Sequence, residues 1–307
     1  MISTQVALLK RELWEHRAIY VTPLVIALII AMLSITGQVA VSAFDQVVDV
    51  ALLGAANLGE AERASAMTVL MLSVSLLFIL AMWVLTIFYS LDSLYAERKD
   101  KSILFWRSVP VTDAETVISK LVTAMLVIPL VTFAVLAATH VLVLVITSIW
   151  VSFRGANAGY LIWQAAPLFD NWLATLIFLL AIPLWLAPFI GWFLLVSAYT
   201  KRSPLLVAFL PIILLPMLER TLVGTRLFAD AIYIRSGKMP LFQGIDTMGL
   251  WSDDGKALHE LGRSGISFLS MVDLGGFLAN PGLWLGLVVC GLFVTAATYV
   301  RRYRDES

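Results

Sequence analysis

A charged and polar segment at 92–120 separates two long apolar runs and carries the residues best suited to chemistry. Five consecutive charged side chains stand in it: Glu97, Arg98, Lys99, Asp100 and Lys101. Charges of both signs at one place pair with charges on a partner surface, and such pairs fix the register of a complex more than its affinity. The chemistry that these residues offer is electrostatic pairing.

An apolar run follows the charges at once. It comprises Ile103, Leu104, Phe105 and Trp106, with Arg107 and Pro110 after it. Burying a large apolar side chain is worth roughly 1.5 to 3 kcal/mol, so an exposed run of this kind favours a partner's groove. Packing on the chain's own bundle or on lipid headgroups fits the residues equally well. Thr112 and, three residues later, Glu115 form a capping-box pattern, which predicts that a new helix begins there.

The order of residues across 92–120 resembles the first cytoplasmic loop of ABC-2-type permeases, the membrane subunits of ATP-driven exporters. The shared pattern is an aromatic residue, ERKDKS, an apolar run, RSVP and a polar stretch that ends at Lys120. More loosely, the resemblance extends from the amino-terminal segment to PGLWLGL at 281–287 and to Arg301 and Arg302.

This resemblance implies a function and a set of partners. The charged and apolar residues named above, together with Pro110, would form a coupling helix that docks on a separate ABC ATPase, present in two copies. ATP and Mg²⁺ would be bound by that ATPase, so no cofactor is expected in this chain. A dimer with a second copy or a related permease is implied, surrounded by the lipids of a bacterial inner (plasma) membrane.

Composition independently indicates a membrane protein. Of the 307 residues, 60% are hydrophobic and 14% are charged, and the mean hydropathy is +0.91. These values lie outside the range of soluble domains. The formal net charge of zero, without a basic tract that contains interleaved aromatics, gives no reason to expect a nucleic-acid partner.

Six apolar runs predict an all-α integral membrane protein with six transmembrane helices. The predicted spans are 20–41, 66–91, 121–150, 172–199, 204–223 and 281–300. The first run has 22 residues without a charge, which as a helix measure about 33 Å and cross the hydrocarbon core. The whole chain, 1–307, forms one permease domain. Its loop at 224–280 is predicted to carry short amphipathic or re-entrant helices on the outer side.

The amino-terminal segment, 1–19, is predicted to be an interfacial helix on the cytoplasmic face. Between 4 and 17 an apolar stripe of Val6, Leu9 and Leu13 faces one way, and Arg11, Glu12 and Glu15 face away from it. Arg17 is placed to extend toward the lipid headgroups.

Prolines predict interruptions within the spans. Pro129 is expected to kink a helix of nearly 40 residues that starts at the Thr112 cap. Pro183 and Pro188 predict a bent or broken fourth span, which is tolerated only where neighbours satisfy the freed carbonyls.

Few ionisable groups lie within or beside the spans. His140 lies in the outer half of the third span, and because no second His or carboxylate accompanies it, a neutral histidine bonded to a neighbouring helix is favoured over a functional one. Glu219 and Arg220 close the fifth span and are typical of interface polarity, with an outward vestibule as the alternative. Cys290 is the only cysteine, so no intrachain disulfide forms.

Catalytic motifs are missing from the sequence. Neither Gly-Lys pair fits a phosphate loop: Gly237 and Lys238 are followed by Met239, Gly255 and Lys256 are followed by Ala257, and both pairs lack the leading glycine. No HExxH motif and no paired intramembrane carboxylates occur, and no serine has a plausible intramembrane histidine base. The chain is therefore not expected to be an enzyme by itself or to bind a metal.

Three classes of function fit these observations. The resemblance favours an exporter that moves its cargo by alternating access, and the apolar walls favour an amphipathic or lipid-like cargo, with peptides and drugs also open. An ion-coupled secondary carrier is the first alternative because broken helices are its hallmark, although it usually needs buried acidic residues. A non-transporting membrane scaffold that anchors an ATPase is the second.

The distribution of Lys and Arg predicts the topology. With both termini, 92–120 and the turn after the fourth span inside, 13 of these residues are cytoplasmic and 3 are outside once the loop 224–280 is set aside. We expect Ser102→Cys and Ser252→Cys, in a chain with Cys290 replaced, to react with an impermeant thiol reagent from opposite sides of the membrane. Labelling from the same side would contradict the six-span arrangement.

Overall fold

The computed structural model of the chain describes residues 2–42, 52–100, 111–242 and 268–303, and it contains no strand among them. An isolated antiparallel bridge joins Phe242 to Val272. Six helical stretches are long and apolar enough to cross a membrane, which confirms the predicted all-α membrane protein. The helices are α1 (Ile2–Glu15), α2 (Ala18–Ser42), α4 (Glu60–Lys99), α6 (Asp113–Val122), η1 (Thr123–Val127), α7 (Ile128–Phe153), η2 (Gly159–Trp163), α8 (Leu168–Trp185), α9 (Ala187–Tyr199), α10 (Pro204–Leu222), α11 (Leu227–Gly237), η3 (Leu269–Met271), α14 (Leu274–Ala279) and α15 (Pro281–Tyr303).

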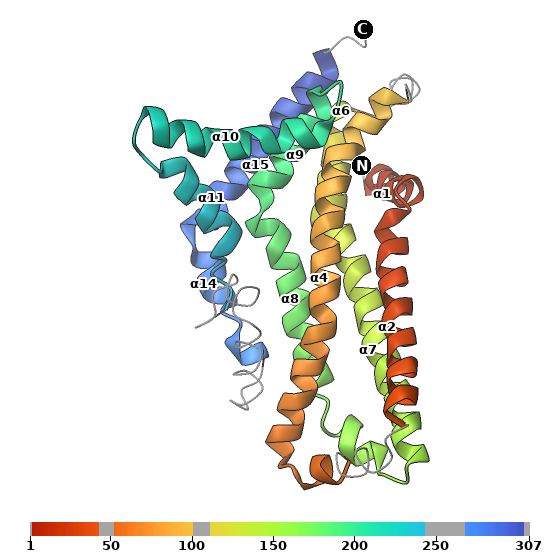
Figure 1. Cartoon of the computed structure of the whole chain (residues 1–307). Helices are drawn as coiled ribbons and strands as arrows, with labels where there is room; N and C mark the ends of the chain where they lie inside the picture. Colours follow the sequence, from red (N-terminus) through yellow and green to blue (C-terminus); the bar gives the residue numbers. More distant parts are fainter. Residues whose placement is uncertain (1, 43–51, 101–110, 243–267, 304–307) are drawn as a thin grey trace.

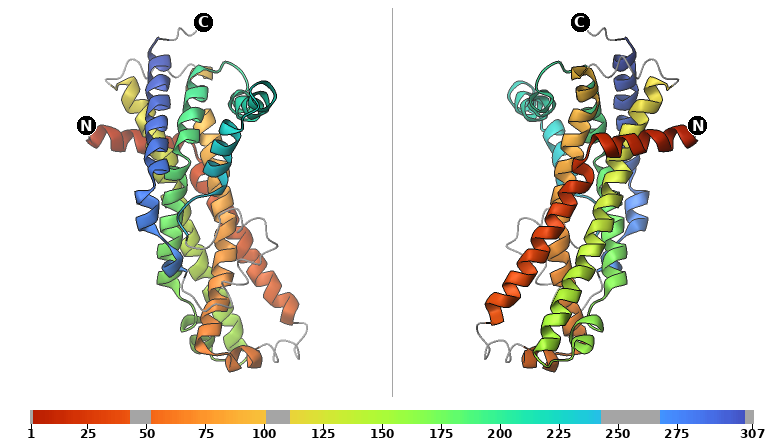
Figure 2. Two further views of the ribbon diagram at one scale, coloured as in Figure 1. Left: turned by 90° about the vertical axis from the view of Figure 1, so that its left-hand side faces the viewer. Right: turned by 90° about the vertical axis from the view of Figure 1, so that its right-hand side faces the viewer.

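The long helices pack side by side as a bundle (Figure 1). Both chain termini lie at one end of it, called here the terminal end, which comprises α1, the last turn of α4, the first turn of α6 and the last turn of α15. At that end α1 lies across the bundle axis (Figure 2), the orientation that an interfacial helix adopts.

The helix predicted to start at Thr112 does so. The Thr112 hydroxyl accepts a hydrogen bond from the Glu115 backbone N–H at 3.2 Å, and the Glu115 carboxylate accepts one from the Thr112 N–H at 2.9 Å. From this cap a helical stretch of 41 residues runs through α6, η1 and α7. Its interruption is a π-helical turn, η1, that ends just before Pro129. Proline has no N–H to donate, which accounts for a change in helix type on its amino-terminal side.

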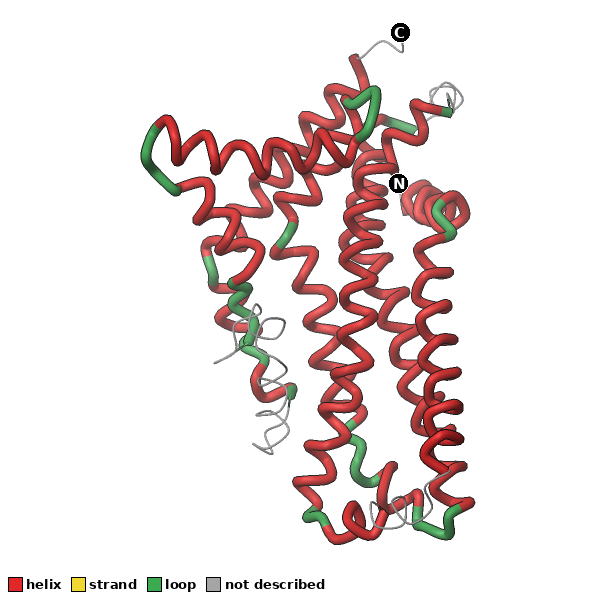
Figure 3. Tube along the Cα trace, in the orientation of Figure 1, coloured by secondary structure: helices red, strands yellow, loops and turns green. Residues whose placement is uncertain are grey.

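The fourth span is broken, as its two prolines predict. Leu186 has φ −86° and ψ 9°, so α8 ends at Trp185 and α9 begins at Ala187. The Leu186 carbonyl accepts hydrogen bonds from the N–H groups of Phe189 and Ile190 at 2.9 and 3.2 Å, which starts the second helix. Figure 3 shows this break as a loop between two helical tubes.

The fifth predicted span has an unexpected orientation. With its 19 residues, α10 is long and apolar enough to cross a membrane, but its axis lies across the bundle at the terminal end (Figures 1 and 2). Its only buried side chain is that of Ala208. Its contacts with α9 include a hydrogen bond that Trp192 Nε1 donates to the Ala208 carbonyl at 3.0 Å and the packing of the Phe193 and Phe209 rings, whose centroids lie 5.5 Å apart. Little of its apolar surface is therefore used within the chain.

Glu219 explains how the chain turns after α10. Its carboxylate accepts hydrogen bonds from Thr225 Oγ1 at 2.7 Å and from the N–H groups of Leu227 and Phe228 at 2.7 and 2.8 Å. These N–H groups belong to the first turn of α11, where a helix has no intrahelical acceptors for them. Glu219 is therefore a helix-capping residue. Within 224–280, the described residues form the short helices α11, η3 and α14.

The helices α9 and α15 approach each other closely. A Cβ at Gly191 would stand 3.0 Å from both the Cα and the carbonyl oxygen of Cys290, so only glycine allows the two backbones to approach this closely. By contrast, a Cβ at Gly291, one residue further along α15, would meet nothing within 4 Å.

We expect Gly191→Ala to destabilise the bundle by about 1 to 3 kcal/mol, because the added methyl group meets backbone atoms that cannot rotate away. Gly291→Ala is the matched control. It should leave stability unchanged or raise it by up to about 1 kcal/mol, since alanine is the better helix former. The measurement is the midpoint of thermal denaturation in one detergent. Equal midpoints for the two variants would contradict the close α9–α15 contact.

Candidate functional site

A group of buried and half-buried polar side chains, most of them charged, lies at the terminal end and joins four helices. We call it the charge cluster and define it as Arg11, Glu12, Tyr89, Glu97, Asp113, Lys120 and Arg301. These residues come from α1, α4, α6 and α15. The two helices that flank 101–110, α4 and α6, are therefore joined to α1 and α15 by one network of polar contacts.

Glu97 is the centre of the charge cluster. Its Oε1 lies 2.9 Å from Arg11 Nη2 and 3.0 Å from Lys120 Nζ, and its Oε2 lies 2.5 Å from Arg301 Nη1. One carboxylate thus holds three cations from three other helices. The carboxylate is only 4% exposed, so these pairs are shielded from solvent and salt and hold their geometry more firmly than surface pairs do.

Glu12 forms the second half of the charge cluster. Its Oε1 accepts from Lys120 Nζ at 2.9 Å, and its Oε2 accepts from the Tyr89 hydroxyl at 2.7 Å. Lys120 therefore bridges the carboxylates of Glu12 and Glu97. His16 packs edge-on against Tyr89, with the ring centroids 4.9 Å apart. Burial lowers the pKa of His16, which favours the neutral ring beside these charges.

The amino-terminal helix is oriented by these contacts. Glu12 is fully buried, as is Leu8 one turn earlier, while Val6 is exposed. Arg11 and Glu12 face away from the Val6 side, as predicted, but the surface that they face is the bundle and not water. Polar contacts and the buried side chain of Leu8 therefore hold α1 against the bundle.

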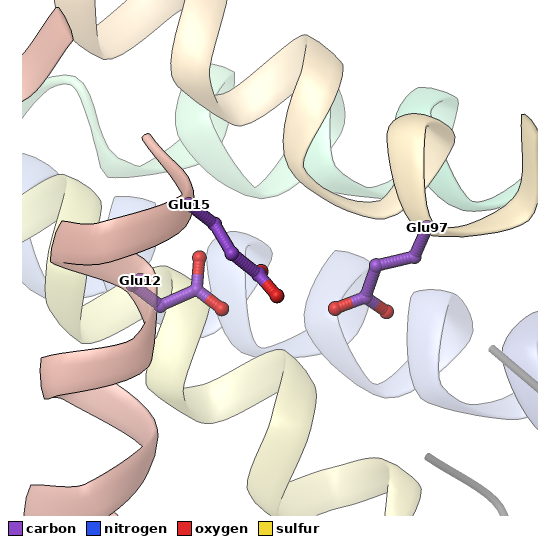
Figure 4. Close-up of side chains that lie close together, drawn as sticks. All are labelled: Glu12, Glu15 and Glu97. Carbon is purple, nitrogen blue, oxygen red and sulfur yellow. The ribbon is translucent and has the colours of Figure 1, made fainter. Parts of the chain in front are cut away.

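Three carboxylates in this region are close enough to suggest a cation site. Oxygen atoms of Glu12, Glu15 and Glu97 lie within 4.8 Å of one another, with two of the side chains on α1 facing the third on α4 (Figure 4). All three already pair with cations of the chain: Glu15 with Arg11 at 2.8 Å, and the other two with Lys120. The ammonium and guanidinium groups occupy the positions where a metal ion would lie, so the geometry favours ion pairs over metal binding.

Arg98 connects the same turn of α4 to α9. Its Nη2 donates to the carbonyls of Ser197 and Thr200, the latter at 2.8 Å. These carbonyls lie at the carboxyl end of α9, where no intrahelical donor reaches them and a cation is favoured. In addition, the Ser197 hydroxyl accepts from the Leu94 and Tyr95 N–H groups at 3.0 and 2.9 Å.

The residues proposed to couple to a partner thus divide into three groups. Glu97 and Arg98 are used within the chain, in the contacts just described. Lys99 and Asp100 are exposed at the end of α4. The others lie outside the described residues: Lys101, Ile103, Leu104, Phe105, Trp106, Arg107 and Pro110.

His140 has the structural role that the sequence favours. Trp172 Nε1 donates to its Nδ1 at 3.2 Å, and its Nε2 lies 3.1 Å from the Met71 carbonyl. A neutral ring with the proton on Nε2 satisfies both bonds, because a ring nitrogen that accepts cannot also carry a proton. His140 therefore joins α7 to α4 and α8.

We expect Glu97→Gln to destabilise the protein by about 3 to 5 kcal/mol, since it leaves three buried cations without their central carboxylate. The matched control is Asp92→Asn, which removes an exposed carboxylate from the same helix and should change stability by less than about 0.5 kcal/mol. Thermal denaturation and the yield of monodisperse protein would measure the effect. If Glu97→Gln behaved like the control, Glu97 would not organise the terminal end.

Comparison with known proteins adds no assignment. No family model, no curated protein and no solved structure matches the chain. Its function is therefore inferred from its own residues and their geometry.

Proposed function

We propose that the chain is the membrane subunit of an ATP-driven exporter of the ABC-2 type. It would move its cargo by alternating access while a separate ATPase subunit, in two copies, hydrolyses ATP with Mg²⁺. Six helices of spanning length and the resemblance across 92–120 support this proposal. The observation that carries it is the charge cluster, because it connects both flanks of the proposed coupling segment to the rest of the bundle.

The geometry suggests how a push on that segment would spread. On its amino-terminal flank, Glu97 binds α1, α6 and α15, and Arg98 binds α9. On its carboxyl-terminal flank, Asp113 pairs with Arg301 at 2.9 Å and Lys120 pairs with Glu12 at 2.9 Å. Displacing 101–110 would therefore move α1, α9 and α15 together with α4 and α6. A coupling element needs this property, since small shifts at a rigid contact become larger helix motions.

The proposed assembly is a dimer with a second copy or a related permease, in a bacterial inner membrane with both termini cytoplasmic. Both termini lie at one end of the bundle, which suits this orientation. The apolar face of α10 that is unused within the chain leaves room for such a subunit or for lipid.

An ion-coupled carrier is less well supported. Such a carrier needs a carboxylate that is free to exchange its ion or proton. The two most buried carboxylates among the described residues, Glu12 and Glu97, are both held by Lys120, and Glu97 also by two arginines. A scaffold without transport has no contact in the structure that favours it over the exporter.

Capture of the partner tests the proposal. We expect Phe105→Ala and Trp106→Ala to weaken binding of the co-expressed ATPase by about 2 to 4 kcal/mol, as loss of a buried interface aromatic does. Phe153→Ala is the matched control, because Phe153 is an exposed aromatic at the carboxyl end of α7, and α7 ends away from the terminal end (Figure 1). The measurement is a pull-down at matched expression, with size-exclusion profiles to verify folding.

Undiminished capture by both aromatic variants would show that this segment does not dock on the ATPase. Capture without ATP-dependent movement of any cargo in reconstituted vesicles would favour the scaffold instead.

A further inference from the structure

A lateral cavity of about 430 Å³ lies between α4, α8, α9, α10 and α11. This volume falls in the range of roughly 300 to 1,000 Å³ that small-molecule sites occupy. Its walls are mostly apolar and include Met82, Trp83, Ile182, Phe189, Phe193 and Phe209. Trp83 and a further lining residue, Leu80, are also exposed on the surface of the bundle, so the cavity opens sideways, toward lipid.

The broken fourth span helps to form this cavity. Pro183 and Leu186, at the end of α8, and Phe189, in the first turn of α9, all line it. An unbroken helix would continue straight along the bundle, whereas the break redirects the chain beside the cavity. In membrane proteins, irregular backbone at this depth is tolerated where it lines a cavity or is buried in protein.

One cation stands in these apolar surroundings. Arg235 of α11 lines the cavity, and its Cζ lies 4.4 Å from the centroid of the Trp185 ring. Within the part of the chain that the structure describes, no carboxylate pairs with Arg235 and no acceptor bonds to it. Its guanidinium is partly desolvated, and burial lowers its pKa. A contact with an aromatic ring offsets only about 0.5 to 2 kcal/mol of that cost.

A second hydrogen-bond donor without an acceptor lies beside the guanidinium of Arg235. The indole Nε1 of Trp185 is buried and has no partner among the described residues. Buried polar groups are normally bonded, and each exception calls for a missing partner. Five guanidinium N–H donors and one indole donor at one place would suit a ligand group that only accepts, such as a carboxylate or a phosphate.

A glycine makes room for the guanidinium of Arg235. A Cβ at Gly286 of α15 would overlap its Nη2, so the guanidinium occupies space that only a residue without a side chain leaves open. The guanidinium therefore reaches across to α15 from the side of the cavity.

We propose that this cavity binds a single-chain lipid with an anionic head, whose tail lies against the apolar wall of α4 and α9 and whose head is held by Arg235. The volume fits one chain, the sideways opening fits entry from the bilayer, and the donors fit the head. That this lipid is the exported cargo rests on the proposed export function. That the cavity binds it does not.

The test measures binding to the full chain in nanodiscs of phosphatidylcholine, without any ATPase. The probe is radiolabelled hexadecanoate, with unlabelled hexadecyl phosphate and hexadecanol as competitors. We expect saturable binding of hexadecanoate, competition by hexadecyl phosphate, and at least about tenfold weaker competition by hexadecanol, because the alcohol has the same tail without the charge. Comparison of the two anionic heads also shows whether carboxylate or phosphate is preferred.

Variants assign the binding to this cavity. Arg235→Gln should weaken hexadecanoate binding about tenfold or more and leave competition by hexadecanol unchanged. Gly286→Ala should act in the same direction, because its methyl group displaces the guanidinium while the charge is kept. Arg226→Gln removes an exposed guanidinium at the other end of α11 and is the matched control, expected to bind as the parent does.

Equal hexadecanoate affinity in the parent and in Arg235→Gln, with both folded by size-exclusion, would overturn the proposal, and so would hexadecanol competing as well as the anions. A photoreactive group at the end of the tail provides a second readout and should label α4 and α9 near Trp83 and Phe189. Labelling confined to other helices would also overturn it. Because no ATPase is present, failure here is distinct from failure of the aromatic variants at 105 and 106 to affect ATPase capture.

Discussion

The carboxylate of Glu97 sets the arrangement of the terminal end. An unpaired charge buried in a protein costs several kcal/mol, so Glu97 and its cations are stable there only together. Arg11, Lys120 and Arg301 come from three helices, and the hydrophobic effect alone would allow each of these helices to rotate or slide against its neighbours. The ion pairs form only at one rotation of each helix about its axis and at one position along that axis. Apolar packing thus supplies most of the bundle's stability, and the charge cluster supplies its register at this end.

Two features of the bundle follow from how helices tolerate interruption. The η1 turn before Pro129 keeps the third span continuous, whereas the break at Leu186 divides the fourth span into two helices. The difference lies in the number and spacing of prolines: one in the first case, and two five residues apart in the second. The break coincides with the cavity, and the continuous helix carries Lys120 and His140, whose contacts depend on a fixed helical phase.

Much of this architecture could be predicted from the sequence. The spans follow from charge-free apolar runs, and the start of α6 follows from Thr112 and Glu115, because local signals act over three or four residues. The charge cluster could not be predicted in this way, since Glu97 lies 204 residues from Arg301 and Lys120 lies 108 residues from Glu12. The only sequence signal for the charge cluster was the presence of charges at the ends of four apolar runs. The positive-inside rule explains such charges as well, so they did not indicate a cluster. The orientation of α10 was missed because length and hydropathy do not specify how a helix lies.

Arg301 lies in the last turn of α15, far along the chain from Glu97, and this separation bears on how the protein is made. A growing chain exposes Glu97 long before Arg301 has been synthesised, so Glu97 must wait with an incomplete set of cations while the later helices insert. The network closes only when α15 has reached its place beside α4 and α6. A chain without α15, or one in which α15 inserts in the wrong direction, keeps a buried carboxylate short of one partner. The Arg301 pair thus distinguishes molecules in which α15 has docked from those in which it has not, and the latter are less stable.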